Sequence, residues 1–143
     1  VMKNNREILS SVLKTTQMGQ IGIRSVMDAA IQPDLRQALG QQLLEYDRIE
    51  TEAHSIASQR GWELRELDPA IRAMTDIMVR MKLSRANPDS KIADLMIQGN
   101  TKGMVKGLKN LHHSDGRDNR IQTLSQKLID TETNNIRQMR PFL

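Results

Sequence analysis

The chain has 143 residues, a formal net charge of +4 and no cysteine, and 38% of its residues are hydrophobic but only 2% aromatic. This length suits one domain with a single core, and the absence of cysteine excludes disulfide frameworks and cysteine-based zinc sites. No stretch approaches the ~18 uncharged apolar residues of a membrane helix, so no membrane partner is expected. We expect a single domain over residues 1–143, and the absence of cysteine favours the cytoplasm.

The apolar residues are of the kinds that favour helices. Nine methionines accompany many leucines and isoleucines, whereas Trp, Tyr and Phe occur once each. Strands are enriched in aromatic and β-branched residues, while unbranched side chains lose little rotamer freedom in a helix. The composition therefore predicts an all-α fold.

Turn-forming residues divide the chain into five predicted helices. The first, over residues 3–30, carries apolar side chains at steps of three and four from Ile8 to Ala30. The second begins with Pro33, which suits the first turn of a helix, and runs to Gly61. Both are predicted to be long amphipathic helices.

The third predicted helix, over residues 69–85, follows an N-cap at Asp68 and carries Met74, Met78 and Met81. The spacing of the three methionines is that of an ordinary core face, and methionine is a flexible filler of irregular interiors. A soft copper site formed by the three thioethers is the disfavoured alternative.

The last two predicted helices form a second long pair. The fourth starts behind an N-cap at Ser90 and extends to Leu111, and the fifth runs from Asp118 to Met139, just before Pro141. No linker, repeat or low-complexity tract separates the five helices, so one compact bundle is predicted.

Glycine is frequent inside the predicted helices, where each costs about 1 kcal/mol relative to alanine. Gly99, Gly103 and Gly107 are spaced by four and predict a ridge without side chains, along which another helix packs closely. Gly19 and Gly22 are its expected counterpart. The sequence leaves open whether this ridge packs within one chain or between two copies, and whether these glycines are simply tolerated at surface positions.

Three segments carry a resemblance to a known group of proteins: residues 41–50 (Gln-Gln-Leu-Leu-Glu-Tyr-Asp-Arg-Ile-Glu), 95–103 (Leu-Met-Ile-Gln-Gly-Asn-Thr-Lys-Gly) and 131–136 (Thr-Glu-Thr-Asn-Asn-Ile). With the Gln-Pro-Asp turn at residues 32–34, they resemble small uncharacterised ferritin-like proteins of Firmicutes. The resemblance implies a bacterial protein with a ferritin-like up-down bundle of four long helices and a shorter helix, residues 69–85, in the crossover connection. A plain five-helix up-and-down bundle is the alternative.

The dimetal site of that superfamily takes a glutamate from each of two helices and a Glu-x-x-His pair from each of the other two. Glu50 and Glu132 both lack a histidine three residues later, and the middle of the first predicted helix offers Gln17 and Gln20 in place of glutamate. Because two divalent ions need several anionic oxygens, the resemblance implies a degenerate dimetal site and no resident cofactor.

Glu50 and His54 nevertheless share one helix face with Tyr46. The favoured interpretation is a structural pair, with Glu132 facing Glu50 or a basic residue inside the bundle, as a buried ion pair or a hydrogen-bonded carboxylate. The alternative function is a metal-binding or oxidase-type protein that holds iron, manganese or zinc in a reduced, non-standard site around Glu50, His54 and Glu132.

The C-terminal half of the chain is its basic half. Lys102, Lys106 and Lys109 share a predicted helix face, with Arg117 and Arg120 close behind. This distribution would suit nucleic acid or an acidic partner. Because stacking aromatic residues and a recognisable reading motif are missing, nucleic acid is not the favoured partner.

Other catalytic patterns are missing too, since the chain has no Gly-rich phosphate loop, serine elbow or His-Glu-x-x-His motif. No catalytic and no cofactor-binding residue is predicted. We therefore expect a non-enzymatic bundle that serves as a structural or protein-interaction module. It is expected to associate with itself, as a homo-oligomer, or with another protein through a helix face.

Overall fold

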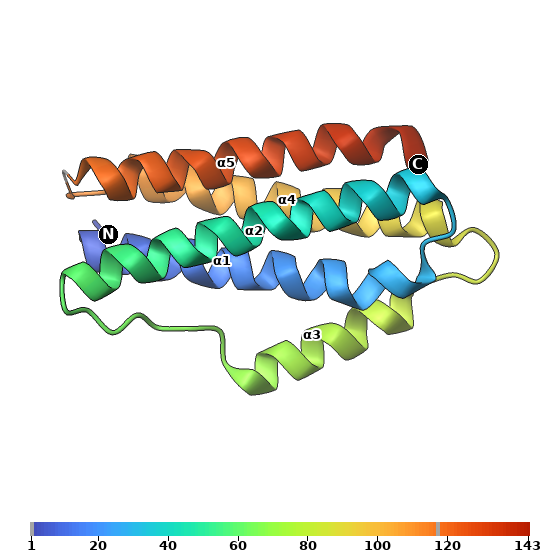
Figure 1. The fold of residues 1–143 in the computed structure, drawn as a ribbon, viewed down its shortest axis with the longest axis horizontal. Helices are drawn as coiled ribbons and strands as arrows, with labels where there is room; N and C mark the ends of the chain where they lie inside the picture. Colours follow the sequence, from blue (N-terminus) through green and yellow to red (C-terminus); the bar gives the residue numbers. More distant parts are fainter. Residues whose placement is uncertain (1, 117) are drawn as a thin grey trace.

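The computed structural model of the chain describes residues 2–116 and 118–143, and five α-helices make up most of it (Figure 1). They are α1 (Asn5–Val26), α2 (Pro33–Gln59), α3 (Pro69–Lys82), α4 (Pro88–His112) and α5 (Asn119–Met139), with short 3-10 turns at η1 (Met27–Ala29) and η2 (Arg140–Phe142). Within the described residues no strand forms, and the one isolated bridge joins Lys3 to Ser114. The predicted all-α class is confirmed.

Most helix ends follow from the local sequence. α1 begins behind Asn4, whose side-chain oxygen accepts a backbone N–H of the first turn at 2.8 Å, and the carboxylates of Asp68 and Asp118 cap α3 and α5 in the same way. The predicted N-cap of α4 at Ser90 is wrong, because the helix begins at Pro88. Proline has a fixed φ and no N–H to leave unpaired, so it suits the first helical position.

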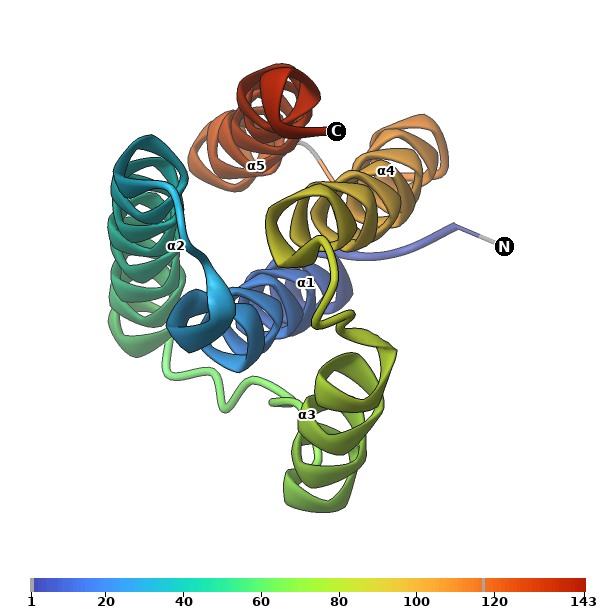
Figure 2. The same ribbon diagram turned by 90° about the vertical axis from the view of Figure 1, so that its right-hand side faces the viewer.

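Four long helices form the bundle, and α3 lies outside it (Figures 1 and 2). α1 and α5 each pack against both α2 and α4, whereas α3 packs chiefly against α1. Successive helices alternate in direction, so the segment 61–68 together with α3 carries the chain back along the bundle (Figure 1). As a result, α2 and α4 run in the same direction within the bundle.

The core is built from leucine, isoleucine and alanine side chains of the four bundle helices. Fully burying one large apolar side chain contributes about 1.5–3 kcal/mol. Asp89 adds a polar tie, because its carboxylate accepts the backbone N–H groups of Ile31 (2.8 Å) and Gln32 (3.0 Å) and fixes the α1–α2 turn to the start of α4. The largest fully buried apolar residues are Leu9, Leu13, Ile23, Leu35, Leu39, Ile49, Ile56, Ile92, Ile121 and Met139.

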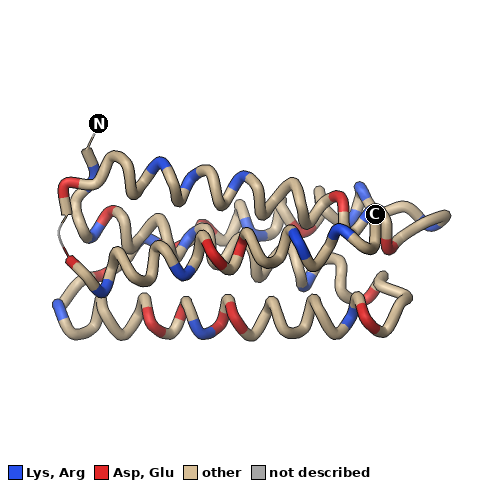
Figure 3. Tube along the Cα trace, turned by 90° about the horizontal axis from the view of Figure 1, so that it is seen from above, with Lys and Arg blue, Asp and Glu red and all other residues tan. Residues whose placement is uncertain are grey.

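Charged residues of both signs are spread along the length of the molecule (Figure 3). In the described part of the chain, no helix has the length and apolarity that crossing a bilayer requires. The most unusual part of the surface is apolar, since large apolar side chains of α3 are exposed.

Candidate functional site

Polar side chains meet in the middle of the bundle, in a central polar cluster formed by Tyr46 of α2, Asn100 of α4, and Glu132 and Asn135 of α5. All four side chains are buried. The Tyr46 hydroxyl donates to Asn100 Oδ1 at 2.9 Å. Asn135 Nδ2 donates to the same oxygen at 3.2 Å and to the Tyr46 hydroxyl at 3.3 Å. The phenol and the two amides therefore satisfy one another's hydrogen bonds inside the bundle.

Glu132 is the carboxylic acid of this cluster and is only 2% exposed. Among the described residues it forms no ion pair, so the expected pairing with a basic residue is not found. Burial raises the pKa of the Glu132 carboxyl to about 8. Glu132 is therefore mostly protonated and neutral at pH 7. Burial, and then the proximity of Glu132, also raise the pKa of Tyr46, so its hydroxyl stays a hydrogen-bond donor.

The residues of the alternative, reduced metal site lie in two different places. Glu132 faces α4, where a Cβ added at Gly103 would overlap its carboxylate. Glu50 and His54 instead lie beside Glu66, and one ligand atom from each of these three lies within 4.8 Å of the others. His54 Nε2 and Glu66 Oε1 are 3.7 Å apart. The structure thus brings Glu50 and His54 together without Glu132 and adds Glu66 from the connection between α2 and α3.

The two glutamines of α1 contact this Glu50–His54–Glu66 cluster from the inside of the bundle. Gln17 Nε2 donates to Glu50 Oε2 at 3.2 Å and to Glu66 Oε1 at 3.0 Å, while its Oε1 accepts the backbone N–H of Leu67 at 2.9 Å. Gln20 Nε2 donates to Glu50 Oε1 at 3.3 Å. Both glutamines are buried, so they fix the positions of the carboxylates that they contact.

Two of the three glycines of the predicted ridge pack against α5 of the same chain. A Cβ added at Gly103 would overlap the Glu132 carboxylate, and a Cβ added at Gly107 would lie 2.8 Å from Cγ1 of Ile129. These two glycines therefore allow the close approach of α4 and α5. Gly99 makes no such approach, because a Cβ there would meet no atom within 4 Å.

The expected role of Gly19 and Gly22 as the counterpart of that ridge is not observed. Gly19 faces the ring of Tyr46 in α2, and a Cβ added at Gly19 would lie 2.5 Å from Tyr46 Cζ. At Gly22 an added Cβ would make an ordinary contact of 3.6 Å with Met96. Gly103 and Gly107 therefore allow α4 to pack on α5, whereas Gly19 allows α1 to pack on α2. In each pair the glycine leaves room for a large side chain of the neighbouring helix.

The methionines predicted for the core lie on the surface. Met74, Met78 and Met81 are 62%, 51% and 79% exposed. Their spacing correctly groups them on one side of α3, but that side faces solvent, so the prediction of a core face is wrong. The physical reason is that α3 packs on α1 through its opposite side, which carries Asp76.

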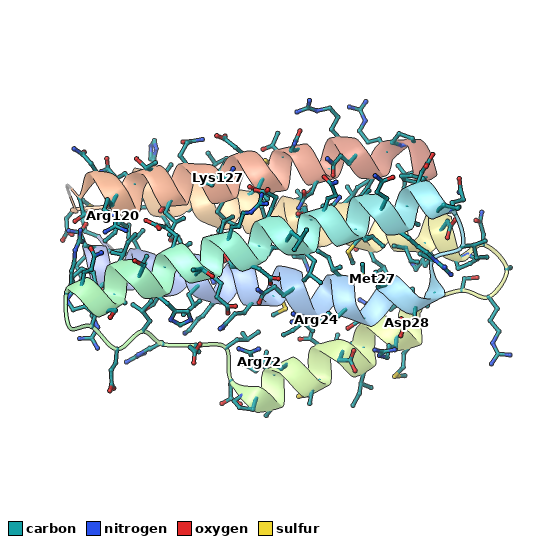
Figure 4. The ribbon with its side chains drawn as sticks, in the orientation of Figure 1. Arg24, Met27, Asp28, Arg72, Arg120 and Lys127 are labelled. Atoms are coloured by element: carbon teal, nitrogen blue, oxygen red, sulfur yellow. The ribbon has the colours of Figure 1, made fainter. Side chains whose placement is uncertain are left out.

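Polar contacts hold that opposite side of α3 against the bundle. Asp76 accepts hydrogen bonds from the Ser25 hydroxyl at 2.6 Å and from Arg80 Nε at 2.9 Å. The Ser25 and Arg80 hydrogen bonds hold the pKa of Asp76 below its usual value. Arg72 turns toward the bundle (Figure 4) and donates to a backbone carbonyl of the preceding segment. Val79 adds a partly buried apolar contact with the core.

The basic residues of the C-terminal half have different surroundings. Lys102, Lys106 and Lys109 are all exposed, and desolvation together with two neighbouring lysines lowers the pKa of Lys106. Arg120 reaches toward α2 (Figure 4) and bonds to two of its side chains at 2.5 and 2.6 Å. Arg117 lies outside the described residues. The expectation about nucleic acid therefore rests on the sequence alone.

Two hollows lie between α2 and α5. The smaller hollow, of about 350 Å³, is lined mainly by amide and carboxylate side chains. One of them is Gln42, whose buried Oε1 has no hydrogen-bond partner among the described residues. Across the larger hollow Arg120 is already paired with Glu52 at 2.6 Å, and Lys127 lies on the same side of α5 (Figure 4). The larger hollow, of about 460 Å³, is lined by Arg48, Ile49, Glu52, Asn119, Arg120, Thr123, Leu124 and Lys127.

Comparison with known proteins identifies a fold. No protein-family model matches the chain, and no curated protein matches it. Among solved structures, the crystal structure of a DUF305 fragment from Deinococcus radiodurans is similar, with a TM-score of 0.76. The match covers 96% of this chain and 93% of that chain, at 14% sequence identity. The two chains share a helical fold. At this identity the likeness extends to the fold alone and transfers no activity.

Proposed function

We propose that the chain is a non-enzymatic protein-interaction module, a helical bundle that binds a second copy of itself through the outward side of α3. We call this surface the α3 face and define it by Ile71, Met74, Ile77, Met78 and Met81. These side chains are between 46% and 79% exposed. The proposal rests on this observation, since a contiguous run of large apolar side chains facing water is typical of an interaction surface.

The polarity of α3 is the reverse of that of an ordinary surface helix. Arg72, Thr75 and Asp76 are only partly exposed, and Asp76 contacts α1 through Ser25. The apolar α3 face turns outward, whereas an ordinary surface helix turns its apolar stripe toward the core. Covering this face with a partner would stabilise the complex by about 25 cal/mol for each Å² of apolar surface removed from water.

A second copy is the partner that the order of residues in α3 favours. Two α3 helices pairing antiparallel about a twofold axis near the middle of the helix would oppose Ile71 of one copy to Met81 of the other. The same axis would oppose Met74 to Met78. Every contact then occurs twice, as a twofold interface requires.

Charge at the two ends of α3 supports the same antiparallel pairing. Asp68 lies at its N-terminal end, Lys82 is its last residue and Arg85 lies just beyond its C-terminal end. All three side chains are exposed. In an antiparallel pair the acidic end of one copy meets the basic end of the other, whereas a parallel pair would oppose like charges.

The proposal includes a ferritin-like affiliation with a degenerate dimetal site. A four-helix bundle with one long crossover connection is characteristic of ferritin-like folds, and here α3 lies in that connection. Where such proteins carry metal-binding acids and histidines, this chain has buried Gln17 beside Glu50. It also has buried Asn100 and Asn135 in the cluster with a mostly protonated Glu132. In this proposal the interior of the bundle has a structural role, and the α3 face binds the partner.

Replacing Met74 and Met78 together by glutamate tests the proposal. In size-exclusion chromatography with light scattering, we expect the wild-type chain to pass from monomer to dimer with rising concentration. The interface is small, so the expected Kd is roughly micromolar. The double variant should stay monomeric at the same concentrations, because four glutamates would meet at the centre of the interface.

Leu44→Glu is the matched control, since Leu44 is 57% exposed but lies on α2, against which α3 does not chiefly pack. Dimerisation that survives Leu44→Glu and is lost in the double variant supports the proposal, provided that the melting temperatures of both variants stay close to that of the wild type. A wild-type chain that is monomeric up to about 1 mM, or a double variant that dimerises as well as the wild type, overturns it.

A further inference from the structure

We infer that Glu50, His54 and Glu66 form a site for one divalent first-row metal ion, for which Zn²⁺ is the best probe. The site lies where α1, α2 and the segment 61–68 meet. Its ligands belong neither to the central polar cluster nor to the α3 face. Metal binding here goes beyond the proposed interaction module and does not depend on it.

The ligand atoms are spaced almost as a metal ion needs them. Ligands about 2.1 Å from Zn²⁺ in tetrahedral geometry lie about 3.4 Å from one another. His54 Nε2 and Glu66 Oε1 are already 3.7 Å apart, and all three ligand atoms lie within 4.8 Å of one another. Glu50 and His54 project from successive turns of α2, so small side-chain rotations are enough to close the site around an ion.

The donor set favours a transition-metal ion. One imidazole nitrogen and two carboxylate oxygens are ligands that zinc accepts, and three protein ligands leave a fourth position open to water. Imidazole suits zinc and its neighbours in the first row, whereas Mg²⁺ prefers oxygen ligands alone. The histidine therefore distinguishes this cluster from an ordinary group of surface acids.

The negative charge of the cluster is not balanced by a described basic side chain of lysine or arginine. Glu50 forms no ion pair among the described residues, and the one basic partner found for Glu66 is His54 itself. Two ionised carboxylates at this separation repel each other. A divalent cation between them would convert that repulsion into attraction.

The buried amide of Gln17 gives the site its preorganisation. Gln17 is 1% exposed and donates to both carboxylates, while its oxygen is held by the backbone of Leu67. Metal sites depend on such supporting hydrogen bonds to orient their ligands. Because Gln17 is locked inside the bundle, it brings Glu66 toward α2 before any ion binds.

A bound ion would join α2 to the connection that leads into α3. Glu66 precedes Pro69, the first residue of α3, by three positions. An ion shared by Glu66 and the two α2 ligands would therefore restrict the segment 61–68. Hydrogen exchange of this segment should become slower when Zn²⁺ is added.

Titration calorimetry of Zn²⁺ into the full chain, after treatment with a chelator, tests the inference. We expect one ion per chain, with affinity at least tenfold lower in Glu66→Gln and in His54→Ala. Glu63→Gln is the matched control, because Glu63 is an exposed acid of the same segment and should leave the affinity unchanged. His113→Ala controls for zinc binding at the adjacent rings of His112 and His113, whose centroids are 5.9 Å apart.

Loss of affinity in Glu66→Gln and His54→Ala alone, together with slower exchange of the segment 61–68, supports the site. Sub-stoichiometric binding, equal affinity in all variants, or loss of binding in His113→Ala overturns it. Dimerisation through the α3 face is measured with the chelator present, so a failure of one proposal is distinguishable from a failure of the other.

Discussion

Replacing Glu132 by glutamine is expected to remove a loss of stability at alkaline pH that is on the order of 5 kcal/mol in the wild-type chain. Glu132 is 2% exposed, and burial raises the pKa of its carboxyl from 4.5 to about 8. Glutamine has nearly the same shape but does not titrate. The free energy of unfolding of the variant should therefore not follow the wild-type dependence on pH.

The direction of this effect follows from proton binding. Between about pH 4.5 and pH 8, the folded chain keeps the Glu132 proton while the unfolded chain has lost it. Below pH 4.5 both states hold the proton, and Glu132 does not reduce the stability of the fold. Above about pH 8 both states have lost it, and the loss of stability is complete. Over this range the wild-type chain loses about 1.4 kcal/mol of stability for each pH unit.

Urea unfolding at pH values from about 5 to 9 measures this dependence. The difference in free energy of unfolding between Glu132→Gln and wild type should grow in favour of the variant as pH rises, whatever constant cost the buried amide adds. Glu63→Gln changes an exposed carboxyl and should leave the pH dependence unchanged. Parallel curves for wild type and Glu132→Gln would contradict a protonated, buried Glu132.

Gly19→Ala is expected to lower the free energy of unfolding by roughly 3 kcal/mol, although alanine is the better helix former. The new Cβ would lie 2.5 Å from Cζ of Tyr46. The ring cannot move away freely, because its hydroxyl bonds to Asn100 and Asn135. Either the central polar cluster or the packing of α1 on α2 must therefore give way, and urea unfolding measures the loss.

Gly99→Ala provides the matched control for this prediction. It makes the same change inside a helix, but no atom lies within 4 Å of the added Cβ, so it should stabilise the chain by roughly 1 kcal/mol. Tyr46→Leu tests the cause, because the shorter side chain leaves room for a Cβ at Gly19. If Gly19→Ala were equally costly with Tyr46 and with Tyr46→Leu, the ring would not be what opposes the Cβ.

Periodicity and turn residues suffice to predict the five helices and the all-α class. Both signals are local, because an N-cap such as Asp68 acts within one turn and an apolar stripe records one side of one helix. The boundary error at Ser90 arises because Pro88 can end one helix or begin the next, and the sequence pattern does not distinguish these roles.

The candidate metal site is only partly predictable, because its parts are distant in sequence. The spacing of Glu50 and His54 is visible on a predicted helix. Glu66 lies in a segment without periodicity, and only the contact made by Gln17 brings it to α2. A buried glutamine that bonds to a loop has no sequence signature of its own, so this ligand was beyond prediction.

The sequence predicts the apolar stripe of the α3 face, but it does not predict that this stripe faces solvent. Periodicity groups Met74, Met78 and Met81 on one side of a helix, and such a stripe normally faces a core. The side of α3 that packs on the bundle is marked by Asp76, which accepts a hydrogen bond from Ser25. This contact depends on the packing of α3 against α1, so the sequence alone does not reveal it. Asn100 is a similar case, because its burial depends on hydrogen-bonding partners from α2 and α5.

Disulfide trapping at Ile77 tests the self-association through α3 most directly, because the chain has no cysteine of its own. Ile77 is 57% exposed and lies beside the proposed twofold axis, where two copies would bring their Cα atoms within reach of a disulfide. Under mild oxidation, Ile77→Cys should form a covalent dimer on a non-reducing gel, while Ile31→Cys, at a position that is 65% exposed in the α1–α2 turn, should stay monomeric. Absence of the Ile77→Cys dimer, or equal trapping at both positions, would contradict the account.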